Sequence, residues 1–300
     1  MYLVYTKKKN VKSVSEHYYR WVFNYKFKLS FHVQKKDMCD HCVRYAKIPE
    51  NRKTELEIKI HNSHVNNKKT PRKLLVQNVE EAKTKSFINV ACFDLQKVLT
   101  IPKSNNSSFY YSRKLAAFNF TIYDVAKKEG FCYVWNESIG NRGADEIASF
   151  VYNYILMKKT EGVTEFHFYS DSCGGQNRNK IIFSMYSKVA EELGVKITHR
   201  YFVSGNSQNP GDTMHARIET KAKSQNIFTQ EQWCDVICTA VVKKPYTVYQ
   251  VTNNFIYNFS HIAEKRKWIN IPISSVREFY VLPYSNSVFI LIYMKKKICK

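Results

Sequence analysis

Two aspartates that each close a strand-like apolar run are the residues best suited to chemistry. Asp94 ends a run over residues 87–95, and Asp171 follows a run over residues 165–170. If the two runs form neighbouring parallel strands, the two carboxylates face each other at one edge of the sheet. Carboxylates this close repel each other unless a cation lies between them, and their hard oxygens suit Mg²⁺ or Mn²⁺. The alternative is that each aspartate only forms a turn or caps a helix.

Phosphoryl transfer with two such ions requires a third acid, which we expect on the helix after the last strand of the sheet. The ions would stabilise both the attacking and the leaving oxygen of the displacement. Asp212 and Glu219 are the candidates. We favour Asp212 because it stands at the helix start, nearer the strand ends. The alternative for Asp212 is a helix N-cap and nothing more.

A second group of candidate metal ligands lies in the first quarter of the chain. Cys39 and Cys42 have the C-x2-C spacing with which two thiolates bind one tetrahedral Zn²⁺. His61 and His64 follow with the spacing H-x2-H, slightly tighter than in a zinc finger, and are the expected remaining ligands. The alternative is a pair of free thiols in a basic surface loop and two solvated histidines on a helix.

The turn after Asp171 is the expected point of contact with a nucleic-acid backbone. It contains two glycines followed by Gln176, Asn177 and Arg178, whose side chains carry hydrogen-bond donors. The turn lacks the lysine and the length of a phosphate-binding P-loop. The alternative is a tight turn with a purely structural role.

The elements that must position these residues follow from the spacing of apolar side chains. Continuous or alternating apolar runs predict strands, and recurrence at i, i+3, i+4 and i+7 predicts amphipathic helices. The expected strands are residues 87–95, 116–123, 131–135, 165–170 and 195–203, and the expected helices begin near residues 143, 180 and 213. The order β-β-β-α-β-α-β-α predicts an α/β fold with a mixed sheet.

The charge of the chain favours a polyanionic partner. The formal net charge is +22, and residues 1–75 hold 18 Lys or Arg against 6 Asp or Glu. A field of this sign attracts nucleic acid and speeds its encounter. The alternative is that the high lysine content reflects codon bias or a need for solubility. No run of about 18 apolar residues occurs, and the cysteine spacing fits reduced thiols, so we expect an intracellular protein, with the nucleus as one location.

These observations predict four segments. Residues 1–75 form a basic module with the cysteine pair, and residues 76–86 form a linker, with an exposed helix as the alternative for this polar region. Residues 87–225 form the α/β domain that carries the acids. Residues 226–300 form a C-terminal extension with a mostly structural role and short strands.

Several strings of the sequence, taken together, resemble a large group of uncharacterised transposon-related proteins abundant in insects. The resemblance covers about residues 15 to 260, and the string at 170–179 is its most distinctive part. The strings are YYRWVF (18–23), DMCDHC (37–42), FDLQ (93–96), FYYSRKL (109–115), NFTIYD (119–124), YVWNE (133–137), RG (142–143) and SDSCGGQNRN (170–179).

The resemblance implies a transposase-like or integrase-like domain with ribonuclease-H architecture that acts on nucleic acid, with Asp94, Asp171 and Asp212 as its acids. His215 and Glu219 match the pattern His-Ala-x-Ile-Glu of the group. Asn206 and Pro210 stand where the group usually has a histidine and an acid. The alternatives are therefore a domesticated binding module without turnover, or a protein-interaction scaffold.

Overall fold

The computed structural model describes residues 14–29, 39–104, 106–109, 111, 113–203, 209–266, 273 and 276–283. The chain divides into two compact units, Met1–Met38 and Cys39–Lys300. In the first unit, helix α2 (Glu16–Trp21) continues into the π-helix η1 (Val22–Lys26), and neither buries a residue. Aromatic rings one turn apart stack along this segment, such as Tyr18 on Trp21.

The second unit contains an eight-stranded mixed sheet with the order β7-β4-β3-β1-β5-β6-β8, in which β2 also pairs with β3. β1 is parallel to β5, β5 to β6 and β4 to β7, and the remaining pairs are antiparallel. The strands are β1 (Ile88–Leu95), β2 (Leu99–Ile101), β3 (Leu115–Asp124), β4 (Glu129–Asn136), β5 (Glu165–Ser170), β6 (Lys196–Tyr201), β7 (Thr247–Gln250) and β8 (Glu278–Val281). The α/β class expected from the sequence is confirmed.

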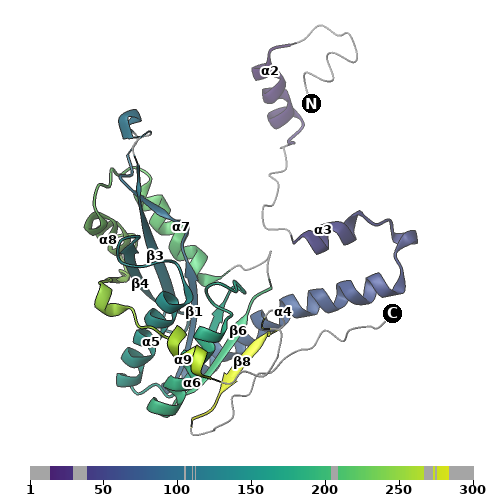
Figure 1. Cartoon of the computed structure of the whole chain (residues 1–300). Helices are drawn as coiled ribbons and strands as arrows, with labels where there is room; N and C mark the ends of the chain where they lie inside the picture. Colours follow the sequence, from purple (N-terminus) through teal and green to yellow (C-terminus); the bar gives the residue numbers. More distant parts are fainter. Residues whose placement is uncertain are drawn as a thin grey trace. The chain divides into compact units, whose positions relative to one another are not determined.

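Helices cover both faces of this sheet (Figure 1). Alternate residues of a strand point to opposite faces, so Ala91 and Phe93 join the core under α5, α6 and α9, while Val90 and Cys92 lie on the face of α4 and α7. The helices are α3 (Asp40–Lys47), α4 (Glu55–Thr84), α5 (Ala144–Thr160), α6 (Lys180–Leu193), α7 (Pro210–Ala222), α8 (Gln230–Cys238) and α9 (Ser260–Lys265). Short 3-10 turns are η2 (Glu50–Arg52), η3 (Ser107–Phe109) and η4 (Asn253–Phe255).

The caps of the two central helices follow the sequence signals. Gly143 is the N-cap of α5, and its N–H donates to the Glu146 carboxylate at 3.0 Å. α6 begins after Asn179, whose side chain accepts from the Ile182 N–H, and ends at Gly194 with φ of 63°. A positive φ there needs a residue without a Cβ, as in most helix C-caps of this kind.

Helix α4 replaces the expected linker. The helix runs without a break through residues 76–84, where we expected a linker. Of the two alternatives for this region, the structure therefore has the helix. Leu75, Val79 and Ala82 recur at helical spacing and pack against β1. A reciprocal cap between Thr54 and Glu57 fixes its start. Most polar side chains between these apolar positions face solvent, which is why composition alone indicated a linker, but Asn78 is buried and donates to the Tyr169 hydroxyl at 3.0 Å.

The C-terminal segment extends the sheet at both edges. β7 pairs with β4, β8 pairs with β6, and α8 packs on β4 through Trp233 and Ile237. Two short strands therefore occur in this segment, and its mostly structural role stays a prediction. Within the described part of the chain, no helix has the length and apolar character that a membrane crossing requires.

Candidate metal centres

Asp94 stands at the end of β1, next to Asp171 at the end of β5. β1 and β5 are parallel neighbours whose last paired residues are Cys92 and Tyr169. Each aspartate lies two residues beyond that pair, so the two acids stand at equivalent positions on adjacent strands. The side-by-side placement expected from the sequence is therefore what the strand pairing gives.

Helix α7 is tied to the end of β1 by its N-cap residue. Asn209 accepts a hydrogen bond from the Gly211 N–H at 3.0 Å and donates from Nδ2 to the Phe93 carbonyl at 3.1 Å. Pro210 occupies the first helical turn, where its missing N–H costs nothing. These contacts bring the first turns of α7 against the residue that precedes Asp94.

Asp94, Asp212 and His215 form one cluster. One ligand atom from each of the three side chains lies within 4.8 Å of the others. Asp212 also accepts a hydrogen bond from the Asn209 N–H at its Oδ2, 2.9 Å away. The N-cap is thus Asn209, and Asp212 supplies one oxygen to the helix start and remains beside Asp94.

Thr121 of β3 connects His215 to the strand that carries Asp94. Thr121 is the cross-strand partner of Asp94, and its hydroxyl donates to the Asp94 carbonyl at 3.1 Å. The same hydroxyl oxygen lies 2.8 Å from Nε2 of His215. With its hydrogen used at the carbonyl, the hydroxyl accepts from Nε2–H, which leaves Nδ1 as the basic nitrogen. Burial lowers the pKa of His215 to about 4, so the ring is neutral at pH 7.

The setting of Asp94 makes its carboxylate costly to ionise. Burial, the charge of Asp171 and, more weakly, the charge of Asp212 raise the pKa of Asp94 to about 7. The Leu95 N–H donates to Oδ1 of Asp94 at 2.8 Å and opposes this shift. A carboxylate in this setting becomes fully charged at neutral pH only when a cation shares the site.

Asp171 is held by the turn that follows it. Oδ1 of Asp171 accepts from Nδ2 of Asn177 at 2.5 Å and from the Cys173 N–H at 3.1 Å. Asn177 is only 2% exposed. Its side chain is therefore committed to Asp171, which corrects the expectation that Asn177 itself faces nucleic acid. Gln176 and Arg178 are half-buried, and their contact with nucleic acid stays a prediction.

Glu219 lies one helical turn beyond His215 and outside the cluster. Its carboxylate pairs with Lys97 at 2.8 Å on the surface, and it acts on the centre only by opposing the fall in the pKa of His215. Of the two candidate third acids, the structure brings Asp212 and not Glu219 beside Asp94. Asn206 lies outside the described residues.

A second centre joins α4 to the start of α3. One ligand atom each from Cys39, Cys42 and His64 lies within 4.8 Å of the others, and Sγ of Cys39 is 3.2 Å from Nε2 of His64. Lys68 approaches Sγ of Cys42 at 3.9 Å, although burial outweighs its charge and raises the pKa of the Cys42 thiol. Two sulfurs and an imidazole are a donor set that Zn²⁺ prefers.

His61 was expected as the fourth ligand but lies outside this group. Its ring stacks on Tyr45, with centroids 3.8 Å apart. The ring of His41 stacks on that of His64 at 4.5 Å. Nδ1 of His41 and Nδ1 of His61 are both buried without a hydrogen-bond partner among the described residues. His41 and His61 therefore each have a ring nitrogen that could bind the metal ion as a fourth ligand.

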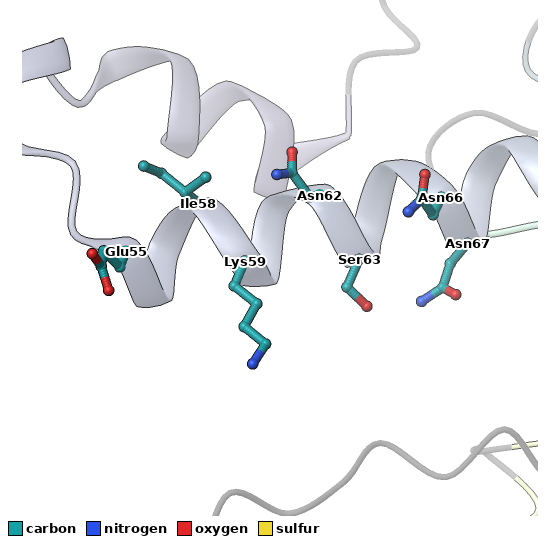
Figure 2. Close-up of a pocket in the computed structure, with 7 residues that line it drawn as sticks. All are labelled: Glu55, Ile58, Lys59, Asn62, Ser63, Asn66 and Asn67. Carbon is teal, nitrogen blue, oxygen red and sulfur yellow. The ribbon is translucent and has the colours of Figure 1, made fainter.

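Two surface hollows lie away from the clustered acids. One of about 520 Å³ runs along α4, where Lys59, Ser63 and Asn67 project from one side of the helix (Figure 2). Another of about 680 Å³ lies between β2 and α7 and includes Lys97, Glu219 and Trp233. The first has no chemically active grouping, whereas the second borders the helix that carries His215.

Sequence reasoning missed Thr121 and Asn209, which position the cluster. Asn209 directly precedes a proline at a helix start, which is an N-cap signal that the sequence offers. Thr121 lies inside a largely apolar strand, and no sequence pattern there indicates a role for its hydroxyl. No protein-family model, curated protein or solved structure matches the chain, so functional assignment rests on this geometry.

Proposed function

We propose that residues 87–225 form a ribonuclease-H-like domain of transposon origin, and that the protein is a divalent-metal-dependent polynucleotidyl transferase or nuclease. The observation that carries the proposal is the meeting of Asp94, Asp212 and His215 beside Asp171. The sheet order supports it, because the five central strands run β4-β3-β1-β5-β6, with β1, which carries Asp94, next to β5, which leads to Asp171.

The donor set fits a hard divalent cation. Asp94, Asp171 and Asp212 would hold Mg²⁺ or Mn²⁺, and burial together with the charges of Asp171 and Asp212 raises the pKa of Asp94, so a cation would relieve the cost of ionising it. When bound, such ions supply charge stabilisation to the oxygens of a phosphoryl displacement. An imidazole in the cluster favours Mn²⁺ over Mg²⁺, because nitrogen is a softer donor than oxygen.

The protein's own groups would position this chemistry. Asn177 fixes the orientation of Asp171, and the N–H of Asn209 fixes that of Asp212. His215 is neutral at pH 7, so its imidazole can bind a divalent cation at the cluster. The positive charge of the chain would bring the polyanionic substrate to this edge of the sheet.

We further propose that Cys39, Cys42 and His64 bind Zn²⁺, with His61 or His41 as the fourth ligand. The 3.2 Å approach of Cys39 to His64 supports this, because it brings ligands of two separate helices together. The ion would have a structural role and fasten α3 to the N-terminal half of α4, where packing in the described residues is sparse.

The alternative function is nucleic-acid binding without turnover. It is favoured by Pro210, which contributes a helix start and no acid at a position where the resembling group has one. The two functions share the fold and the charge and differ only in catalysis.

A cleavage assay separates them. Purified protein should nick plasmid DNA in Mn²⁺, and Asp94→Asn should reduce the rate by at least about a hundredfold because it removes a charge required by the ions. Asp235→Asn, an exposed aspartate of α8, is the matched control and should keep full activity. Equal nicking by Asp94→Asn and the wild type would remove the catalytic proposal, and DNA binding without nicking would favour the alternative.

A further inference from the structure

Arg178 lies near Asp171, and Arg277 lies near Arg178. Arg178 follows the turn that holds Asp171, and its Nη1 reaches the Val276 carbonyl at 3.4 Å, directly before Arg277. Among the described residues, neither Arg178 nor Arg277 forms an ion pair. The nearby Arg200 differs, because Glu278 neutralises it at 2.7 Å.

Arg178 is held in place but incompletely bonded. Its guanidinium lies 5.9 Å from the centre of the Tyr201 ring, and the Tyr201 hydroxyl donates to the Asn177 carbonyl at 3.1 Å. Nε of Arg178 is buried and has no hydrogen-bond partner among the described residues. Burial is the main cause that lowers the pKa of Arg178, and the charge of Arg277 lowers it further. Both make the positive charge on the Arg178 guanidinium less favourable.

A cavity next to Arg277 opens at the end of the sheet that carries the acids. It has a volume of about 230 Å³ and lies between α4 and the ends of β6 and β8. Arg277 and Tyr201 line it, together with the polar side chains of Asn66, Asn67 and Thr70. Tyr201 pairs with Ser170 in the sheet, one residue before Asp171.

We propose that Arg178 and Arg277 bind a phosphate of the nucleic-acid backbone beside the acids of the metal centre. A phosphate would neutralise two like charges that the protein leaves unpaired, and it would accept from the planar donors of each guanidinium. The side-chain amides of Asn66 and Asn67 are neutral donors suited to the adjoining sugar and phosphate oxygens, whereas the Thr70 hydroxyl already donates to the Asn66 carbonyl at 2.8 Å.

This inference rests on the proposed function, because it names the part of the substrate that this edge of the sheet holds. It does not depend on turnover, however, since arginine binds phosphate without a metal. The same Asn177 that orients Asp171 lies directly before Arg178, so the acid and the phosphate site are parts of one turn.

Binding of a labelled DNA duplex, followed by fluorescence anisotropy in EDTA at several salt concentrations, tests the proposal. Arg277→Gln should weaken binding about tenfold at low salt and reduce the dependence of log K on log salt by about one, the effect of one lost phosphate contact. Arg277→Lys should recover most of the affinity. Because the Arg277 side chain forms no hydrogen bond or ion pair among the described residues, these variants should fold like the wild type.

Lys128→Gln is the control variant, because it removes one positive charge as Arg277→Gln does. Lys128 is exposed in the β3–β4 turn, at the opposite edge of the sheet from Asp94, and its removal should change affinity by less than about twofold. Arg277→Gln behaving like Lys128→Gln would overturn the proposal, as would a wild type that binds no DNA at low salt. Binding that depends on Arg277 in a protein that does not nick DNA would uphold the phosphate site and refute the proposed catalysis.

Discussion

Nδ2 of Asn177 donates a hydrogen bond to Oδ1 of Asp171 at 2.5 Å, inside a turn where Asn177 is almost fully buried. The amide, with the Cys173 N–H, therefore holds Oδ1 of Asp171 in the turn. Residues that orient a metal ligand without touching the metal commonly change affinity or activity by ten- to a hundredfold.

Asn177→Leu tests this positioning role. The variant keeps the volume and removes the donor, so Mn²⁺ affinity should fall about tenfold or more. Asn153→Leu is the control, since Asn153 donates to the Ser149 carbonyl within α5 and has no contact with the acids. Isothermal titration with Mn²⁺ measures both variants. An unchanged affinity in Asn177→Leu would show that the hydrogen bond serves the turn alone.

Two single substitutions test whether Asp212 or Glu219 is the third acid of the site. Asp212→Asn should abolish Mn²⁺-dependent nicking, because Asp212 lies in the cluster with Asp94. Glu219→Gln should cost at most a few-fold, because its carboxylate is engaged with Lys97 on the surface. Rates measured under single-turnover conditions decide between them, and the reverse ranking would make Glu219 the third acid.

The cysteine centre predicts one zinc ion per chain. Cys42→Ser or His64→Ala should remove the ion and lower the melting temperature, because binding free energy at such a site is also folding free energy. Cys238→Ser, at the exposed end of α8, should keep both the ion and the stability. Elemental analysis of purified protein and thermal unfolding measure the two effects. Wild-type protein without zinc after purification in zinc-containing medium would refute the site.

His61 and His41 compete for the fourth position of that centre. Each has a buried Nδ1 without a partner among the described residues, so each gains a bond if it ligates the ion. The one that does should, when changed to alanine, weaken zinc binding by about tenfold or more, and the other should not. Competition with a zinc chelator gives the two affinities. Equal and unchanged affinities would assign the position to water or to another residue.

The buried His199 predicts how the stability changes in acid. Its Nε2 lies 2.9 Å from the Ser170 hydroxyl, and burial lowers its pKa from 6.5 to about 3. Below pH 6.5 the unfolded chain therefore takes up a proton that the folded chain refuses, and stability falls as pH decreases towards 3. The slope is at most about 1.4 kcal/mol per pH unit for one group.

His199→Gln isolates this contribution. The raised pKa of Asp94 acts with the opposite sign, since the folded state then binds the extra proton, but it is present in both proteins and cancels in their difference. Urea unfolding at several values between pH 7 and pH 4 should give a shallower loss of stability for His199→Gln than for the wild type. Parallel curves would mean that His199 is protonated in the folded state.

The sequence predicted the parts of the fold that depend on local pattern. The run before Asp94, the stripe of α5 and the Gly194 cap each carry their signal within a few residues. Helix α4 was harder, because its three apolar contacts with β1 are diluted by polar residues. The strand β2 is only three residues long, and it forms by pairing with β3, which lies further along the chain. No local sequence pattern therefore predicts it.

The acids of the site were predictable and their supports were not. Asp94 and Asp171 end apolar runs, so their types and positions are visible in sequence. The roles of Thr121, Asn209 and Arg277 exist only after β3, α7 and β8 have met the ends of β1 and β6. Such contacts join residues that are about a hundred or more positions apart, and a single sequence holds no local trace of them.

Direct measurement of Mn²⁺ binding tests the central claim, which is that the acids on neighbouring strand ends hold a divalent cation. Electron paramagnetic resonance of free Mn²⁺, titrated with wild-type protein, Asp94→Asn and the control Asp235→Asn, reports binding without any need for turnover. We predict saturable binding by the wild type and the control, and at least a tenfold weaker affinity in Asp94→Asn. The same affinity in all three proteins would contradict the account.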